Sequence, residues 1–117
     1  MILVVRLISI GILILIYNLT ICFSAWAETF TFTNESWPSG VKVDIRMGND
    51  TGKAENNPSI GPPISIPYHG SYPLPNPNCE GVWWRRENNP GVSDGKWFPS
   101  WNLQPCYAGH DETIEAN

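Results

Sequence analysis

Alternation of apolar and polar residues is the feature that most constrains the fold of this 117-residue chain. Residues 29–33 read TFTFT and residues 41–47 read VKVDIRM, so every second side chain is apolar. A period of two is typical of a β-strand with one buried face. Pro38 and Gly40 interrupt the sequence between the two segments. We therefore predict a hairpin or a strand–loop–strand pair with these residues facing inward: Phe30, Phe32, Val41, Val43 and Ile45.

Prolines restrict the middle of the chain. Residues 58–77 contain seven of the eleven prolines, around a short alternating segment, ISI, at residues 64–66. Proline has no amide N–H to donate to a neighbouring strand, so this stretch predicts edge strand or polyproline II conformation and excludes a central strand. Residues 48–63 are rich in Gly, Asn, Asp and Pro and predict a loop.

Two aromatic segments near the C-terminus predict a second hairpin. Residues 82–86 read VWWRR and residues 96–101 read KWFPSW. Between them, residues 88–95 read NNPGVSDG, and the Asp-Gly pair in this segment favours a tight hairpin turn. Pro99 indicates that the second segment lies at a sheet edge or contains a bulge.

The number and placement of the cysteines predict a single disulfide. Cys79 and Cys106 lie almost symmetrically outside the predicted hairpin, where a bond between them would hold its open end. The chain-entropy model gives about 3.5 kcal/mol of stabilisation for a loop of this length. The third cysteine, Cys22, falls within an N-terminal leader.

That leader, residues 1–27, has the pattern of a secretory signal peptide. Arg6 precedes an unbroken run of apolar or small residues at 7–17, and small residues stand at positions 25 and 27, which a signal peptidase reads. The run is short for a transmembrane helix, which needs about 20 apolar residues. We expect cleavage after Ala27 and release into the periplasm or the extracellular space. The alternative is that residues 7–23 stay uncleaved and anchor the protein in the membrane. If the leader is cleaved, we expect no stable membrane attachment.

The part that follows the leader is small and acidic. Residues 28–117 contain three Lys and three Arg against four Asp and seven Glu, a net charge of −5, which argues against nucleic acid or anionic membrane as partners. The short alternating segments, with no helix-period segment, predict an all-β fold over residues 28–107. The expected architecture is a small antiparallel β-sandwich or barrel of about five to seven short strands. Residues 108–117 lack apolar periodicity and predict an acidic flexible tail.

Tryptophan is the clearest candidate for a binding function. Neighbouring strand residues point to opposite faces, so Trp83 and Trp84 cannot both enter the core. An exposed indole beside arginine suits a sugar ring, a peptide or a protein surface. The alternative is that arginine or the Pro-rich stretch covers the outer ring by cation–π stacking. The predicted ligand-binding residues are Trp83, Trp84, Arg85, Arg86, Trp97 and Trp101.

Charged side chains offer weaker candidates. Arg85 and Arg86 should face opposite ways and form cross-strand ion pairs, for instance with Glu87 or Asp94. Glu80 and Glu87 are in principle an acid/base couple for glycoside cleavage, although nothing in the sequence sets their separation.

The sequence contains few residues and motifs that are typical of metal sites or of enzymes. Residues 48–57 carry oxygen ligands of the kind calcium takes, but turn chemistry also explains them. Two histidines are too few for a His-based metal site, and no phosphate loop, nucleophile elbow or zinc spacing occurs. We predict no enzymatic activity, no metal and no cofactor.

The best functional hypothesis from the sequence is an exported, non-catalytic binding module that recognises a carbohydrate or an extracellular or periplasmic protein. One alternative is an inhibitor or toxin-like effector that presents the rigid Pro-rich stretch 58–77 to a partner. Another is a structural component of an envelope. The size and the disulfide-braced β fold resemble those of the periplasmic lysozyme inhibitors, a likeness of architecture that implies no residue roles.

Overall fold

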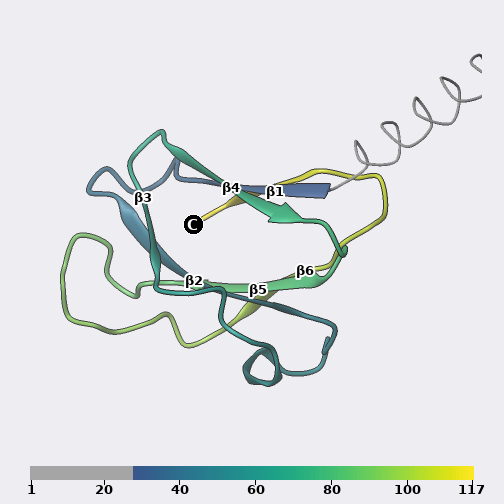
Figure 1. Cartoon of the computed structure of the whole chain (residues 1–117). Helices are drawn as coiled ribbons and strands as arrows, with labels where there is room; N and C mark the ends of the chain where they lie inside the picture. The colour runs from purple at the N-terminus through teal and green to yellow at the C-terminus, as the bar shows by residue number, and fades with distance from the viewer. Residues whose placement is uncertain (1–27) are drawn as a thin grey trace, which may run out of the picture.

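Two β-sheets pack face to face in the computed structural model, which describes residues 28–117 (Figure 1). The predicted leader lies outside the described residues. One sheet has the strand order β4-β1-β7 and the other the order β3-β2-β5-β6. The strands are β1 (Glu28–Thr33), β2 (Val41–Gly48), β3 (Ile64–Ile66), β4 (Ser71–Asn76), β5 (Gly81–Arg86), β6 (Asn102–Gln104) and β7 (Glu112–Glu115). The predicted all-β class with a disulfide is therefore confirmed.

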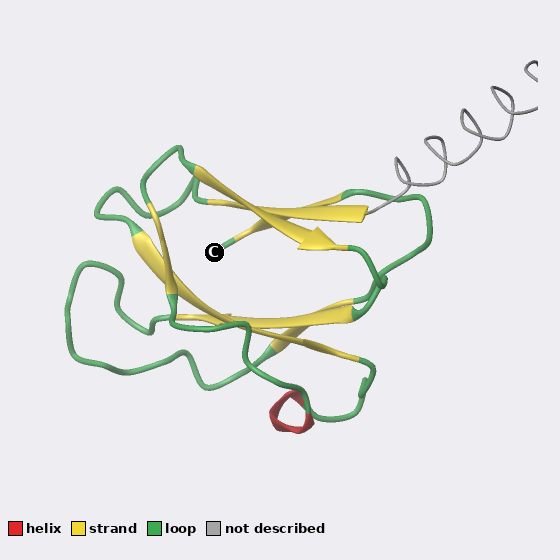
Figure 2. Ribbon diagram, viewed as in Figure 1, coloured by secondary structure: helices red, strands yellow, loops and turns green. Residues whose placement is uncertain are grey.

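The helical content of the described residues is limited to one 3-10 turn, η1 (Ala54–Asn56), red in Figure 2. It lies in the loop that joins β2 to β3. Among residues 28–117, no helix has the length and apolar character needed to cross a membrane.

The core lies between the two sheets and follows the alternation in the sequence. Phe30 and Phe32 of β1 are fully buried, and Val41, Val43 and Ile45 of β2 are at most 2% exposed. Leu74, Val82 and Ile114 are among the residues of other strands that belong to the same cluster. All five residues that were predicted to face inward do so, because the period of two places them on one side of each strand.

The first two strands lie in different sheets, so they form the predicted strand–loop–strand pair and not a hairpin. Asn34, which is fully buried, holds the connection. Its side-chain amide donates hydrogen bonds to the carbonyl oxygens of Trp37 (3.0 Å) and Ile66 (3.1 Å), and its Oδ1 accepts one from the Trp37 amide (2.9 Å). The amide thereby links the end of β1 to β3 in the opposite sheet.

The Pro-rich stretch supplies the edge strands β3 and β4, one in each sheet. Pro73 and Pro75 of β4 pair with β1 on one side and leave the other side of β4 free. The prediction that this stretch contains no central strand is confirmed, because a strand without these N–H groups is tolerated only where one side needs no partner.

The C-terminal hairpin exists with a different second strand. Strand β5 pairs with β6, which begins at Asn102. The prediction that residues 96–101 form the second strand is therefore wrong. From that segment only Trp97 forms a bridge, to Glu87. Pro99 interrupts the ladder, so the chain leaves β5 in a long loop and returns to it only at β6.

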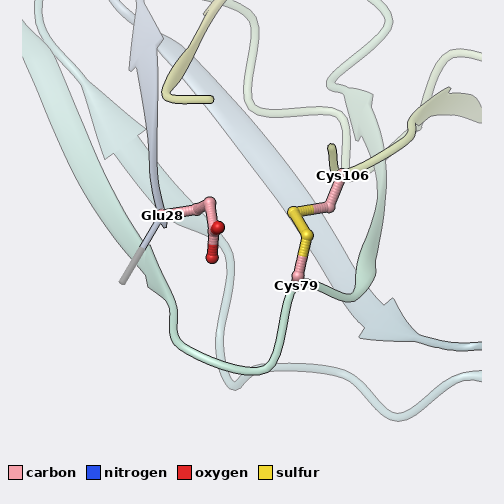
Figure 3. A group of neighbouring side chains, drawn as sticks. All are labelled: Glu28, Cys79 and Cys106. Atoms are coloured by element: carbon pink, nitrogen blue, oxygen red, sulfur yellow. A yellow bond between two sulfur atoms is a disulfide. The ribbon is translucent and has the colours of Figure 1, made fainter. Parts of the chain in front are cut away.

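The disulfide between Cys79 and Cys106 forms as predicted. Cys79 lies two residues before β5, and Cys106 lies two residues after β6. The bond therefore closes the end of the hairpin that is opposite to the long loop. Figure 3 shows the two cysteines beside Glu28, the first residue of β1.

The prediction of a flexible tail at residues 108–117 is wrong. Strand β7 lies in this segment and pairs in parallel with β1. Ile114 is 5% exposed and Ala116 is fully buried, while the Ala116 carbonyl accepts a hydrogen bond from the Trp37 indole N–H at 2.9 Å. One buried isoleucine in a four-residue strand gives no detectable period, and its partner β1 is at the other end of the domain.

Candidate functional site

The outer face of the β3-β2-β5-β6 sheet carries charged and aromatic side chains in alternation. Asp44 and Arg46 of β2 stand opposite Arg85 and Trp83 of β5, respectively. These residues occupy the strand positions between the buried ones, so the pleat directs them away from the core.

The two adjacent tryptophans of β5 separate as expected. Trp84 enters the core, where it is 8% exposed and meets the Phe32 ring edge-on at 6.0 Å. Trp83 lies on the outer face, half-buried, and its indole N–H donates to the Asp50 carbonyl at 2.9 Å. Trp84 therefore belongs to the core, and the position of Trp83 is fixed by the loop between β2 and β3.

Arg85 covers two of the predicted binding residues. Its guanidinium carbon lies 4.3 Å from the ring centroid of Trp101 and 5.3 Å from that of Trp97. The same guanidinium forms an ion pair with Asp44, with Nη2 and Oδ2 3.1 Å apart. Stacking of this kind stabilises a partly buried arginine and shields part of each indole from water. Trp97 and Trp101 thus lie together on the outer face, half-buried.

Arg86 lies away from Arg85, at the end of the sandwich. Its guanidinium carbon is 4.7 Å from the ring centroids of both Trp37 and Phe98. Its Nη1 donates to the carbonyl oxygen of Glu87 at 2.8 Å. The expected cross-strand ion pair forms for Arg85, with Asp44 of β2 as its partner. Arg86 forms no ion pair within residues 28–117 and donates to backbone carbonyl oxygens.

The long loop between β5 and β6 forms a groove against β2 and β3. Figure 1 shows this loop projecting beyond the end of β5. One hollow of about 410 Å³ lies between residues 91–93 of the loop and residues 39–42 and 65–67. A second hollow, of about 290 Å³, adjoins it and shares Lys42, Glu87 and Ser93 with it. We call the two hollows together the loop groove.

The second hollow of the loop groove has an aromatic wall with charged neighbours. Trp97 and Pro63 supply apolar surface, and Lys42, Lys96 and Glu87 supply charge. Glu87 is held in place because its Oε1 accepts a hydrogen bond from the Lys42 amide at 2.9 Å. The arrangement of an apolar surface with a few polar groups at its border is typical of small-ligand sites.

Hydrogen bonds within the loop hold the outer wall of the groove. The Asn88 amide donates to the Lys96 carbonyl at 2.9 Å, and the Val92 amide donates to the Asn89 carbonyl at 3.0 Å. Asp94 Oδ1 accepts a hydrogen bond from the Lys96 amide at 3.0 Å. This backbone hydrogen bond is the main cause that lowers the pKa of Asp94 below its ordinary value. The loop is therefore ordered by its own contacts.

The two carboxylates considered for glycoside cleavage lie at opposite ends of β5. Glu80 precedes this strand and Glu87 follows it. The six residues of β5 between them separate their backbones by roughly 20 Å, whereas the two carboxyl groups of a glycosidase lie at most about 10 Å apart. Geometry therefore excludes this pair as an acid/base couple.

Two other clusters do not form ligand sites. Glu28, Cys79 and Cys106 lie close together, but the sulfur atoms are bonded to each other and Glu28 Oε1 accepts a hydrogen bond from the Gly109 amide (Figure 3). Asp50 accepts hydrogen bonds from the Asn56 side chain and from two loop amides, which lowers its pKa. Its carboxylate therefore serves the turn between β2 and β3.

Sequence reasoning identified Trp97 and missed the groove that it lines. Lys42 was placed on the outer side of its strand by alternation, and Lys96 was assigned to a strand. No local signal joins the two lysines, because the loop that brings them together is positioned by tertiary contacts such as the approach of Gly91 to Ser39.

Comparisons of this chain with protein-family models, with curated proteins and with solved structures find no match.

Proposed function

We propose that this protein is an exported, non-catalytic binding module that holds a carbohydrate in the loop groove. Export is supported by the sequence pattern of residues 1–27 and by the disulfide, which is typical of proteins that fold in oxidising compartments. Trp97 carries the proposal for the site.

Trp97 combines two properties that suit a sugar. Arg85 stacks on the Trp97 ring and restrains the indole before any ligand binds. Trp97 also lines the hollow of about 290 Å³. An indole offers a flat apolar surface for the C–H face of a sugar ring. Restraint of the ring in advance lowers the entropic cost of binding. Glu87 and the two lysines at the border supply partners for hydroxyl groups.

The test measures glycan binding by the purified protein. The full-length chain, including its leader, is expressed in a host that exports it. We expect that Trp97→Ala lowers affinity for the bound glycan by at least about tenfold, the size expected for a binding hot spot of at least about 1.4 kcal/mol. Tyr107→Ala is the matched control, since Tyr107 is 60% exposed and lies next to the disulfide at the opposite end of β5.

Retention of the disulfide and of the far-ultraviolet circular dichroism spectrum shows whether each variant is folded. Trp97→Phe, which keeps a smaller ring, distinguishes loss of stacking from collapse of the loop. If no glycan on a broad panel binds the wild-type protein, the proposal is wrong.

An inhibitor that presents the loop between β5 and β6 is a second candidate. The Pro-rich stretch that was first considered contains strands β3 and β4 and does not protrude as one loop. In contrast, Val92 is 56% exposed at the tip of residues 88–96, whose internal hydrogen bonds keep the loop rigid. Inhibition of a panel of secreted glycosidases and proteases tests this candidate. Inhibition of one of these enzymes by the wild-type protein but not by Val92→Asp would support this candidate. If no enzyme on the panel is inhibited, the candidate is wrong.

A further inference from the structure

The distribution of lysines points to the kind of sugar. Residues 28–117 contain only three lysines, and two of them, Lys42 and Lys96, line the same hollow of the loop groove. The third, Lys53, lies in the loop between β2 and β3 and does not line either hollow. The groove therefore concentrates positive charge in a domain whose net charge is −5.

Neither groove lysine forms an ion pair in the part of the chain that the structure describes, although the exposed Asp94 carboxylate, which accepts a hydrogen bond from the Lys96 amide, lies in the same loop. The ion pairs found there join Arg85 to Asp44 and His69 to Glu35. Glu87, the acidic residue of the groove, uses Oε1 to accept a hydrogen bond from the Lys42 backbone amide. Both ammonium groups are thus available to a ligand.

Arg85 restrains the aromatic wall, while its own charge is already paired with Asp44. The guanidinium carbon of Arg85, on β5, lies 5.3 Å from the centroid of the Trp97 ring, which belongs to the long loop. The attraction of opposite charges at the surface is modest and falls with added salt, but it acts on a ligand that the indole already positions.

We propose that the loop groove binds a saccharide that carries a carboxylate, such as a hexuronic acid or a sialic acid. In this arrangement the ring stacks on Trp97, the carboxylate lies between Lys42 and Lys96, and the free oxygen of Glu87 accepts a hydrogen bond from a ring hydroxyl. This inference rests on the proposed carbohydrate-binding function and adds the chemical class of the ligand.

The experiment compares acidic sugars with their neutral counterparts by titration calorimetry. The probes are trigalacturonic acid and its methyl ester, in which a methyl group takes the place of each carboxylate charge, together with sialyllactose and lactose, which lacks the sialic acid. We expect one acidic probe to bind at least about tenfold more tightly than its neutral counterpart, with affinity that decreases as salt is added. Which acidic probe binds identifies the source of the carboxylate.

Lysine variants assign the effect to the groove. Lys42→Gln and Lys96→Gln should each weaken binding of the acidic probe by about tenfold, the lower range for a hydrogen bond to a charged group. Lys53→Gln removes the same charge outside the groove and should change affinity by less than about twofold. All three side chains are exposed, so folding should not be affected.

The outcomes separate this inference from the function on which it rests. Equal binding of trigalacturonic acid and its ester, lost in Trp97→Ala, would leave the carbohydrate site in place and overturn the carboxylate inference. Equal effects of Lys53→Gln and Lys96→Gln would also overturn it, because they would reflect net charge alone. Absence of binding to any glycan would overturn both.

Discussion

Single buried polar residues determine where this chain changes sheet. Asn34 satisfies three hydrogen bonds with one side chain and has no access to water. Asn76, also fully buried, makes equivalent bonds to the amide and the carbonyl of Glu80 in the turn before β5. Both amides form hydrogen bonds with backbone groups at corners where the chain leaves one sheet for the other, and these bonds supplement the strand pairing there.

Replacement of Asn34 should therefore be costly. We expect Asn34→Ala to lower the free energy of unfolding by about 2–3 kcal/mol, given about 1 kcal/mol for each hydrogen bond that is lost. Urea denaturation of the oxidised protein measures this change. Asn49→Ala is the control, since Asn49 is exposed, and it should change stability by less than about 0.5 kcal/mol. Similar free energies of unfolding for the two variants would mean that the buried side-chain amide of Asn34 contributes little to stability.

At the scale of secondary-structure elements, the molecule depends on pairings between distant segments. Strand β1 lies between β4 and β7 in its sheet, and β7 joins it in parallel from the end of the chain. Strand β7 is short, but its Ile114 packs into the common core. A segment with the composition of a tail is thereby part of the fold.

Substitution within β7 distinguishes a strand from a tail. We expect Ile114→Ala to lower the free energy of unfolding by about 2–4 kcal/mol, because a buried side chain of this size leaves a cavity. Thr113→Ala, at the exposed neighbouring position, should have an effect below about 0.5 kcal/mol. Thermal unfolding followed by circular dichroism provides the measurement. An unchanged melting temperature for Ile114→Ala would mean that β7 does not contribute to stability.

At the scale of the whole molecule, the covalent link compensates for a small core. Sheets of three and four strands enclose a limited set of buried apolar residues, and small domains of this kind often need a disulfide. The link joins the chain before β5 to the chain after β6, which has only three residues. It therefore restricts the unfolded chain and secures the shortest pairing of the second sheet.

Removal of this disulfide should lower the stability of the whole domain. The double variant Cys79→Ser/Cys106→Ser should lose about 3.5 kcal/mol of stability, the chain-entropy value for this loop. Urea unfolding with and without a reductant gives an internal control, since the reductant should destabilise the wild-type protein and leave the double variant unchanged. Equal stability of the two proteins under oxidising conditions would contradict the prediction.

The sequence by itself determined the properties that depend on local geometry. Alternation identified which faces of β1 and β2 are buried, because strand side chains point to opposite sides in turn. Proline content identified edge strands, because a residue without an N–H group cannot serve a central ladder. The opposite placement of Trp83 and Trp84 followed from the same alternation, and the position of the cysteines around the hairpin identified the disulfide.

Only the tertiary structure decided how these pieces combine. It placed β1 and β2 in different sheets, joined β7 to β1, delayed the partner of β5 until Asn102 and brought Lys42 beside Lys96 and Trp97. Each of these results depends on contacts between residues far apart in the chain, and such contacts leave no mark on the local pattern. Pairing is selected by the burial of the whole apolar surface and by a few buried amides, so the groove exists only once both sheets have packed.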